Sequence, residues 1–423
     1  MEIVEIKEEE YKEFLKQYKD ISFFQSVEWA KFKSKSEWNM TIIGLKDKNK
    51  IKAAATLLYR KIPIINKRMY YSPRGYVIDF NDFDLIKEFT IELKKYLKKN
   101  NGIFLKINPY VEYIKRDKDG NKISDANDKL VDLLKSLGYL HNGFYINQDE
   151  KKDLEPRWLS VLNIENKDID TILKETRQTT RWMINKSKKN SINIKIAGFE
   201  DIKTFKEVMN DTALRREFED RAISYYENMY KMIDKDILRI VIADINLLDL
   251  KNTMNTEIKH LEERIDKIKD IEKKKNQVLE FESQINALNK RLKEIQIDIE
   301  KYGDNPVVAV GLYLTYQDQT VYLFGGSYKE FMGYGAQYLM QYEMIKYSIE
   351  RGMKKYNFYG IDGNFNEDSK NYGLFDFKRG FNSDVVELIG EFDLIVSNFY
   401  YKLYNFMMVS YKKLRHIKGI LKK

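Results

Sequence analysis

The clearest pattern of apolar and polar positions is a heptad repeat within residues 250–302. Its first arm has apolar residues at alternating spacings of four and three: Met254, Ile258, Leu261, Ile265 and Ile268. After the polar stretch KKKNQ the alternation resumes at Val278, Phe281, Ile285, Leu288, Leu292, Ile295 and Ile299, and it ends before Gly303. Such spacing places the apolar side chains on one seam of a helix. Two arms around a polar turn predict an antiparallel coiled-coil hairpin.

The sequences that flank this hairpin have the short apolar runs of β-strands, LRIVIADI before it and VVAVGLYLTY after it. The hairpin is therefore predicted to interrupt a sheet between two neighbouring strands. Without it, one order occurs twice along the chain: antiparallel strands, a helix and another strand. The helix and last strand read IKEFTIELKKYLKKNNG and IFLKINPY in the first copy, and YLMQYEMIKYSIERG and KKYNFYGIDG in the second.

This repeated order is typical of an acetyltransferase (GNAT)-like unit. We therefore predict an α/β (α+β) fold of two tandem GNAT-like domains with an inserted antiparallel coiled-coil hairpin. A chain of 423 residues is long enough for two such cores. The assigned parts are a first domain (1–155), a second domain (156–249 and 303–393), the hairpin (250–302) and a basic, aromatic C-terminal helix (394–423).

Composition excludes several kinds of chemistry. The chain has no cysteine and only three scattered histidines, which excludes a disulfide framework and a thiol nucleophile and gives metal binding little to use. It has no GxSxG, Walker or Rossmann pattern. We therefore expect neither a metal nor a bound cofactor.

The N-terminal sequence MEIVEIKEEEYKEF is acidic where a secretory signal has basic and apolar residues, and the sequence has no apolar run long enough to cross a bilayer. We expect a cytoplasmic location. The formal net charge of +9 favours polyanionic partners, although a merely soluble basic protein has the same charge.

Basic residues gather in two segments. Residues 172–189 combine six lysines and arginines with Trp182 and a single acid, Glu175, a composition that suits contact with nucleic acid phosphates. After Asp393 the chain has no acid, and aromatic residues accompany Lys402, Lys412, Lys413, Arg415, Lys418, Lys422 and Lys423. A helix of this kind suits the inner, anionic surface of the plasma membrane. A helix packed on its own domain, with a solvated basic tail, is the open alternative.

A glycine-rich segment with Gly325, Gly326, Gly333 and Gly335 follows the strand TVYLF and precedes a helix. Backbone amides at such a helix start can hold a phosphate or an oxyanion. Acyl-coenzyme A transferases use a loop of this sort, but theirs begins with a basic or amide residue where this chain has Glu330. Glycines that only turn the chain are the structural alternative.

Three segments occur in a fixed order between strand patterns: FFQSVEWAKFK, RREFEDRAISYY and GLFDFKRGF. Together with the inserted hairpin, they resemble the FemABX family of peptidoglycan bridge-forming aminoacyltransferases over essentially the whole chain. The resemblance implies transfer of an amino acid from aminoacyl-tRNA to the side-chain amine of the muramyl stem peptide. The acceptor would be lipid II or UDP-MurNAc-pentapeptide.

The same resemblance assigns roles to residues of this chain. Lys378 in FDFKRGF matches the family lysine that stabilises the tetrahedral oxyanion, and Phe377 beside it would shape the pocket. Lys33 and Arg221 match the pair that contacts the acceptor's phosphates. An exposed lysine and surface ion pairs are the structural alternatives for these positions.

Three further residues are weaker candidates for substrate binding. Tyr225 lies about one helical turn after Arg221 and would share its face, Tyr328 follows the double glycine, and Arg74 lies in the sequence SPRG.

One position departs from the family pattern. Relatives often have an aspartate before a proline in the fourth strand of the first domain, whereas this chain reads KINPY, with Asn108. An amide cannot accept a proton. We therefore expect the amine to lose its proton to the substrate, to solvent or to another carboxylate such as Asp79.

Two other functions remain open from the sequence. One is an N-acyltransferase that uses acyl-coenzyme A, which the glycine-rich segment permits. The other is a non-catalytic adaptor that binds tRNA or the cell envelope and uses the hairpin as a docking arm. The amino acid transferred, the bridge position and the oligomeric state are open as well.

Overall fold

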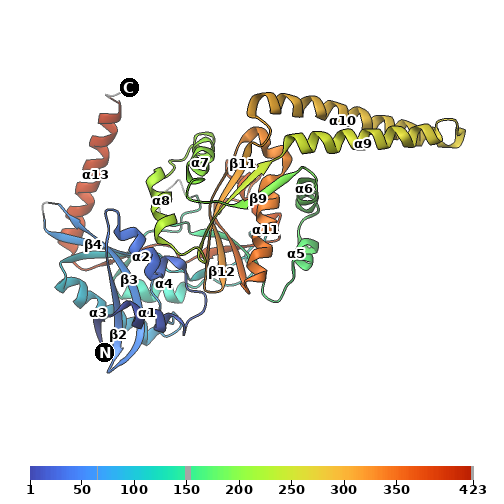
Figure 1. Cartoon of the computed structure of the whole chain (residues 1–423). Coiled ribbons are helices and arrows are strands. Elements are labelled where there is room, and N and C mark those ends of the chain that lie inside the picture. Colours follow the sequence, from blue (N-terminus) through green and yellow to red (C-terminus); the bar gives the residue numbers. More distant parts are fainter. Residues whose placement is uncertain (64, 148–153, 421–423) are drawn as a thin grey trace.

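The computed structural model describes residues 1–63, 65–147 and 154–420. These residues form two mixed sheets with helices on their faces, a long helical hairpin and a projecting C-terminal helix (Figure 1).

The first sheet has seven strands in the order β1-β2-β3-β4-β5-β15-β7. They are β1 (Glu2–Glu5), β2 (Asn39–Asp47), β3 (Lys50–Ile62), β4 (Lys67–Ser72), β5 (Gly102–Ile107), β15 (Phe392–Ile395) and β7 (Tyr139–His141). The helices around it are α1 (Glu8–Leu15), α2 (Val27–Ser34), α3 (Phe83–Lys99) and α4 (Asp128–Ser136).

The second sheet has eight strands in the order β6-β14-β8-β13-β12-β11-β10-β9. They are β6 (Glu112–Lys115), β14 (Asp384–Leu388), β8 (Trp158–Asn163), β13 (Lys355–Ile361), β12 (Gln319–Ser327), β11 (Val307–Tyr316), β10 (Leu238–Ile245) and β9 (Ile192–Ile196). The helices around it are α5 (Ile169–Glu175), α6 (Gln178–Lys188), α7 (Ile202–Arg216), α8 (Ile223–Met232), α11 (Ala336–Glu350) and α12 (Tyr372–Arg379).

The two sheets repeat one topology. In each, four antiparallel strands are followed by a helix and by a fifth strand that runs parallel to the fourth: β4, α3 and β5 in the first, and β12, α11 and β13 in the second. The predicted fold class, two tandem GNAT-like units, is confirmed.

Each half of the sequence also contributes a strand to the other sheet. Strand β6 pairs with β14 in the second sheet, and the C-terminal β15 lies between β5 and β7 in the first. Because the sheets exchange strands, the domain boundaries assigned at residues 155 and 393 do not separate one sheet from the other, and they remain a prediction.

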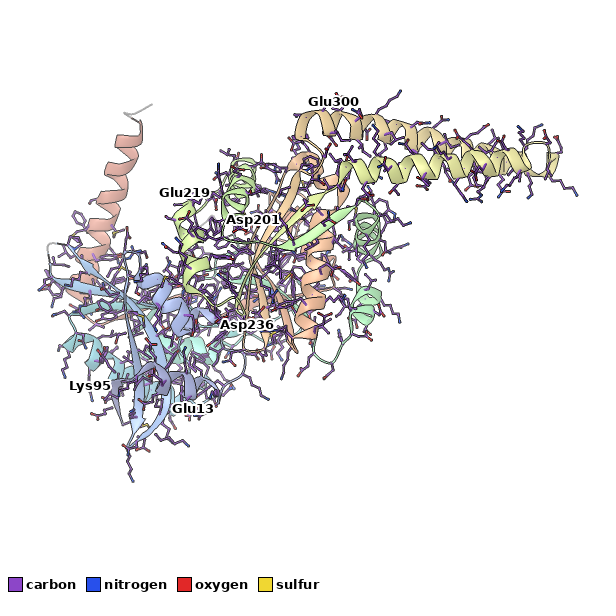
Figure 2. The ribbon with its side chains drawn as sticks, in the orientation of Figure 1. Glu13, Lys95, Asp201, Glu219, Asp236 and Glu300 are labelled. Atoms are coloured by element: carbon purple, nitrogen blue, oxygen red, sulfur yellow. The ribbon has the colours of Figure 1, made fainter. Side chains whose placement is uncertain are left out.

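The predicted hairpin is confirmed as α9 (Leu247–Ile268) and α10 (Lys275–Tyr302), joined by a short 3-10 turn. It interrupts the chain between β10 and β11, which are antiparallel neighbours. Heptad residues from both arms are buried, among them Leu261 on α9 and Phe281 on α10. The hairpin projects away from both sheets, and Glu300 marks its root (Figures 1 and 2).

The C-terminal helix α13 (Asn398–Ile420) leaves the first sheet in a different direction from the hairpin (Figure 1). Its first turns are anchored, since the rings of Tyr401 and Tyr404 lie 5.2 and 5.3 Å from that of Phe104 on β5. Among the described residues, no helix combines the length and apolar character that a membrane crossing requires.

The second sheet has a separate core on each face, as alternate residues of β10 show. Val241 and Ala243 join an outer core with residues of α5, α6 and α11. Ile240 and Ile242 join an interdomain core, where α7 and α8 meet aromatic residues from the first half of the chain: Phe23, Phe24, Trp29 and Phe32. This interdomain core fixes α2 of the first half beside α8 of the second.

Candidate active site

Two cations from different halves of the chain meet at the edge of the interdomain core. Lys33 lies in the last turn of α2, a helix whose start is capped by Ser26, and Arg221 lies just before α8. The Lys33 Nζ atom is 5.7 Å from the ring centroid of Tyr225, and the Arg221 guanidinium carbon is 5.6 Å from the same centroid. The three residues that the sequence grouped are therefore together in space.

Within residues 1–63, 65–147 and 154–420, these cations have no anionic partner at contact distance. Burial, and secondarily the charge of Arg221, lowers the pKa of Lys33. Among the described residues, neither side chain forms an ion pair or a hydrogen bond. Figure 2 shows Glu219, two residues before Arg221, in the connection between α7 and α8. Because two close cations repel each other until an anion binds, the pair is suited to a phosphate or diphosphate.

Arg74 joins the two halves of the chain below this pair. It lies in a turn after β4, with φ at 54°, and is 4% exposed. Its backbone N–H donates to Asn108 Oδ1 at 2.8 Å, and its guanidinium donates to the carbonyl oxygen of Pro156 at 2.7 Å. Arg74 is thus a buried connector that positions the segment leading into β8.

Asn108 is occupied in the same network. Besides accepting from Arg74, its amide nitrogen donates to the Tyr71 hydroxyl at 3.1 Å. This arrangement fits a structural role, in keeping with an amide that cannot serve as a base.

The structure adds a carboxylate that the sequence reasoning missed. Glu155 accepts a hydrogen bond from the Tyr359 hydroxyl through Oε2. Burial raises the pKa of Glu155, whereas the nearby charges of Arg74, Lys33 and Arg221 and the bond from Tyr359 lower it. We call Lys33, Arg74, Glu155, Arg221, Tyr225 and Tyr359 the interdomain cluster.

Asp79, the carboxylate named from the sequence, is not part of this cluster. It is exposed, and its carboxylate accepts from the backbone and side-chain nitrogens of Asn81 at 2.9 and 3.1 Å. The suggestion that Asp79 serves as a base is therefore wrong in geometry, because a base must reach the proton that it removes.

Lys378 lies on α12 with its side chain buried, 4% exposed. Its Nζ donates to the carbonyl oxygen of Gly360 on β13 at 2.7 Å. Burial lowers the pKa of Lys378 to about 7. Phe377 beside it packs into the outer core, with its ring 5.0 Å from that of Tyr338.

Neighbouring residues of β13 connect Lys378 with the interdomain cluster across the second sheet. Phe377 and Phe358 pack in the outer core, whereas Tyr359 packs in the interdomain core. The residue between the two sites is Gly360, which bonds Lys378 and directly follows Tyr359.

The backbone ladder between β12 and β13 ends close to this point. The two parallel strands pair only from Gln319 to Val321, although β12 continues to Ser327 and β13 to Ile361. In the first sheet the equivalent strands pair from Arg68 to Ser72, the last residue of β4. Beyond Val321 no backbone pairing between β12 and β13 is described, so side chains lie between the two faces of the sheet there.

Tyr328 packs against both the interdomain core and the outer core. It caps the short 3-10 helix after β12, and burial together with Glu207, Asp211 and Glu330 raises its pKa. None of the described residues of the interdomain cluster is among its ring or hydrogen-bond partners. Its predicted role in substrate binding remains a prediction.

The lowered pKa of Lys378 makes a prediction about stability. Below pH 7 both the folded and the unfolded chain bind a proton at Lys378, but between about 7 and the ordinary lysine pKa of about 10.4 only the unfolded chain does. The unfolding free energy of the wild type, minus that of Lys378→Met, should therefore rise with pH in this window by up to about 1.4 kcal/mol per unit. Urea unfolding at several pH values measures it. A difference that stays constant with pH would contradict the assignment.

A duplicated GNAT-like fold, with two close cations in its interdomain cluster and a buried lysine on α12, defines an acyltransferase-type enzyme. The model of the FemAB family matches residues 6–408. The chain belongs to the FemAB family, and the enzyme class predicted from the sequence, an aminoacyltransferase, is confirmed.

Individual relatives agree with this assignment. The chain is 32% identical to "Aminoacyltransferase FemA" of Staphylococcus epidermidis over 372 residues, which cover 86% of this chain and 88% of the relative. It is 31% identical to the protein of the same name from Staphylococcus aureus over 379 residues, 88% of this chain and 89% of the relative. The crystal structure of FemX superposes with a TM-score of 0.76 at 26% identity, covering 95% of this chain and 99% of that one.

Proposed function

We propose that this protein transfers an amino acid from aminoacyl-tRNA to the side-chain amine of a peptidoglycan precursor stem peptide and so builds the interpeptide bridge. The acceptor is lipid II or UDP-MurNAc-pentapeptide, both of which carry a diphosphate. The single observation that carries the proposal is the Lys33–Arg221 pair, two close cations that have no ion-pair partner in the part of the chain that the structure describes and that match a diphosphate.

The reaction needs orientation and charge stabilisation more than activation. The ester of an aminoacyl-tRNA is already reactive, and attack by an amine places a negative charge on the carbonyl oxygen. The protonated Lys378, buried beside Gly360, is suited to stabilise that oxyanion. Phe377 is suited to pack against the aminoacyl group from the outer core.

The tRNA is proposed to approach from the face that carries Lys378. The basic segment 172–189 lies there, because Ile172 and Ile184 pack in the same outer core as Phe377. Arg177, at the start of α6, pairs with Asp376 on α12 at 2.7 Å. The indole of Trp182 is 59% exposed and can stack on a nucleotide base.

The direct experiment incubates the protein with tRNA charged with glycine, alanine or serine and with either acceptor. Transfer to the acceptor supports the proposal, and absence of transfer from every charged tRNA refutes it. Thermal stabilisation by acetyl-coenzyme A, with none by the muramyl nucleotide, would favour the acyl-coenzyme A alternative. Full biological activity of a Lys378→Ala variant would favour the adaptor.

A lipid-linked acceptor calls for contact with the inner face of the plasma membrane, and α13 is the proposed contact. Phe399 and Phe406 on this helix are 71% and 72% exposed. Of the basic residues that follow, Lys412, Lys413, Arg415 and Lys418 belong to α13, and Lys422 and Lys423 lie outside the described residues.

Removal of residues 409–423 should weaken binding to phosphatidylglycerol-containing vesicles at least tenfold, because each basic residue near an anionic surface contributes about 1 kcal/mol. Tyr401 and Tyr404 stay in place to hold the root of α13. Cosedimentation measures the effect, with phosphatidylcholine vesicles as the control. Equal sedimentation of the truncated and the full chain would exclude this membrane contact.

A further inference from the structure

Glu155 occupies a place that the roles proposed so far leave unexplained. It is partly exposed, it belongs to the segment between β7 and β8, and it lies among residues from both halves of the chain. Among the described residues, the charges with the largest effects on its carboxylate are those of Arg74, Lys33 and Arg221, all of them cations. Glu155 thus places a negative charge in the interdomain cluster, among cations that favour the binding of anions.

The bonding of Glu155 argues against a purely structural ion pair. Arg74, the cation with the largest effect on the pKa of Glu155, donates its guanidinium to the Pro156 carbonyl oxygen. The Tyr359 hydroxyl fixes one carboxylate oxygen, Oε2. The other oxygen, Oε1, accepts no hydrogen bond from any residue in the described part of the chain. One oxygen is therefore held in place while the second is available to a ligand.

Glu155 is connected to Lys378, the residue proposed to stabilise the oxyanion, through two successive residues of β13. Lys378 contacts Gly360, Gly360 follows Tyr359, and Tyr359 holds Glu155. Glu155 also interacts electrostatically with Lys33 and Arg221, where the acceptor's diphosphate is proposed to bind. In the proposed reaction the acceptor extends from this pair toward Lys378, and Glu155 is the carboxylate connected to both sites, to Lys378 through Tyr359 and Gly360 and to the pair through its charge.

We propose that Glu155 is the general base that removes the proton from the attacking amine, and that Tyr359 is its positioning residue. This inference rests on the proposed transfer reaction. The neutral amine attacks the ester carbonyl, a C–N bond forms, and the extra proton on nitrogen passes to Glu155. Collapse of the intermediate breaks the C–O bond, and the ribose oxygen takes up that proton, which leaves Glu155 ionised again.

The first test compares Glu155→Gln with the wild type in transfer from charged tRNA to the muramyl acceptor. The amide keeps the shape and can accept the Tyr359 bond, but it cannot take a proton. We expect kcat to fall about 100-fold or more, as for loss of a general base, and the KM for the acceptor to change less than about threefold. Asp79→Asn, the same exchange at an exposed site outside the cluster, should leave both constants unchanged.

Two further variants separate a base from a structural residue. Glu155→Gly should regain part of its turnover with added formate, which a merely structural role would not allow, and Glu155→Asp should retain more turnover than Glu155→Gln. The proposal is overturned if Glu155→Gln keeps kcat within about threefold of the wild type, if only its acceptor KM rises, or if formate restores nothing to a folded Glu155→Gly. An inactive wild type would refute the proposed function itself, so the two failures are distinguishable.

Discussion

Replacement of Lys378 by methionine is expected to lower kcat for aminoacyl transfer by about 100- to 1,000-fold, the effect of removing one oxyanion donor. The side chain is buried, and its Nζ lies against Gly360 at the point where the two faces of the second sheet meet. Methionine has a similar length and no charge. A fall in kcat would therefore be caused by the missing positive charge and not by a cavity. The KM for the acceptor should change little, because Phe377 beside Lys378 packs in the outer core, whereas Phe32 beside Lys33 packs in the interdomain core.

The matched control for Lys378→Met is Lys346→Met on α11, where the lysine is 48% exposed. This variant should retain wild-type turnover. The thermal midpoint of Lys378→Met should not fall markedly, since the exchange removes a buried cation. A folded Lys378→Met enzyme with undiminished kcat would exclude Lys378 from the chemistry.

Removal of Lys33 or Arg221 should weaken binding of the acceptor, whereas removal of Lys378 should lower kcat. Lys33→Ala and Arg221→Ala are each expected to raise the KM for the diphosphate-bearing acceptor by about 10- to 100-fold, because a hydrogen bond to a charged group contributes about 1.5–3 kcal/mol. The kcat at saturating acceptor should stay within a few-fold of the wild type. The double variant should lose less than the sum of both effects, since the two side chains share one ligand.

Lys31→Ala is the control for this pair. Lys31 is on the same helix two residues before Lys33, but it is 51% exposed and pairs with Glu8 at 2.7 Å. It should leave the acceptor KM unchanged. If Lys33→Ala and Lys31→Ala behave alike, or if the cations affect a truncated acceptor without phosphates equally, the diphosphate assignment is wrong.

Features with a local periodicity could be predicted from the sequence. The hairpin follows from apolar residues such as Leu261 and Phe281 at heptad spacing, and each arm needs only its neighbour to bury them. The duplicated sheet follows because each unit repeats the same short-range order of strands and helix. The family motifs paired Lys33 with Arg221, and helical spacing added Tyr225; the structure places both cations near the Tyr225 ring, and their roles remain a prediction.

Features that depend on distant pairing could not be predicted in this way. The exchange of β6 and β15 between sheets is decided by packing across the whole chain, and nothing in either short strand indicates its partner. Glu155 precedes a proline and a strand without any motif, and only the fold brings it to Tyr359, which is 204 positions away. The sequence also could not predict that α12, with Lys378, and α2, with Lys33, lie on different faces of the second sheet. The burial pattern of one helix does not show which face of a sheet that helix covers.

The most direct test of the transfer reaction is mass spectrometry of the acceptor after incubation with charged tRNA and wild-type protein. The proposed function predicts that the stem peptide gains the mass of one amino acid residue, that fragmentation places it on the side-chain amine, and that Lys378→Met abolishes most of the gain. An unchanged acceptor with every charged tRNA, or an equal gain with Lys378→Met, would contradict it.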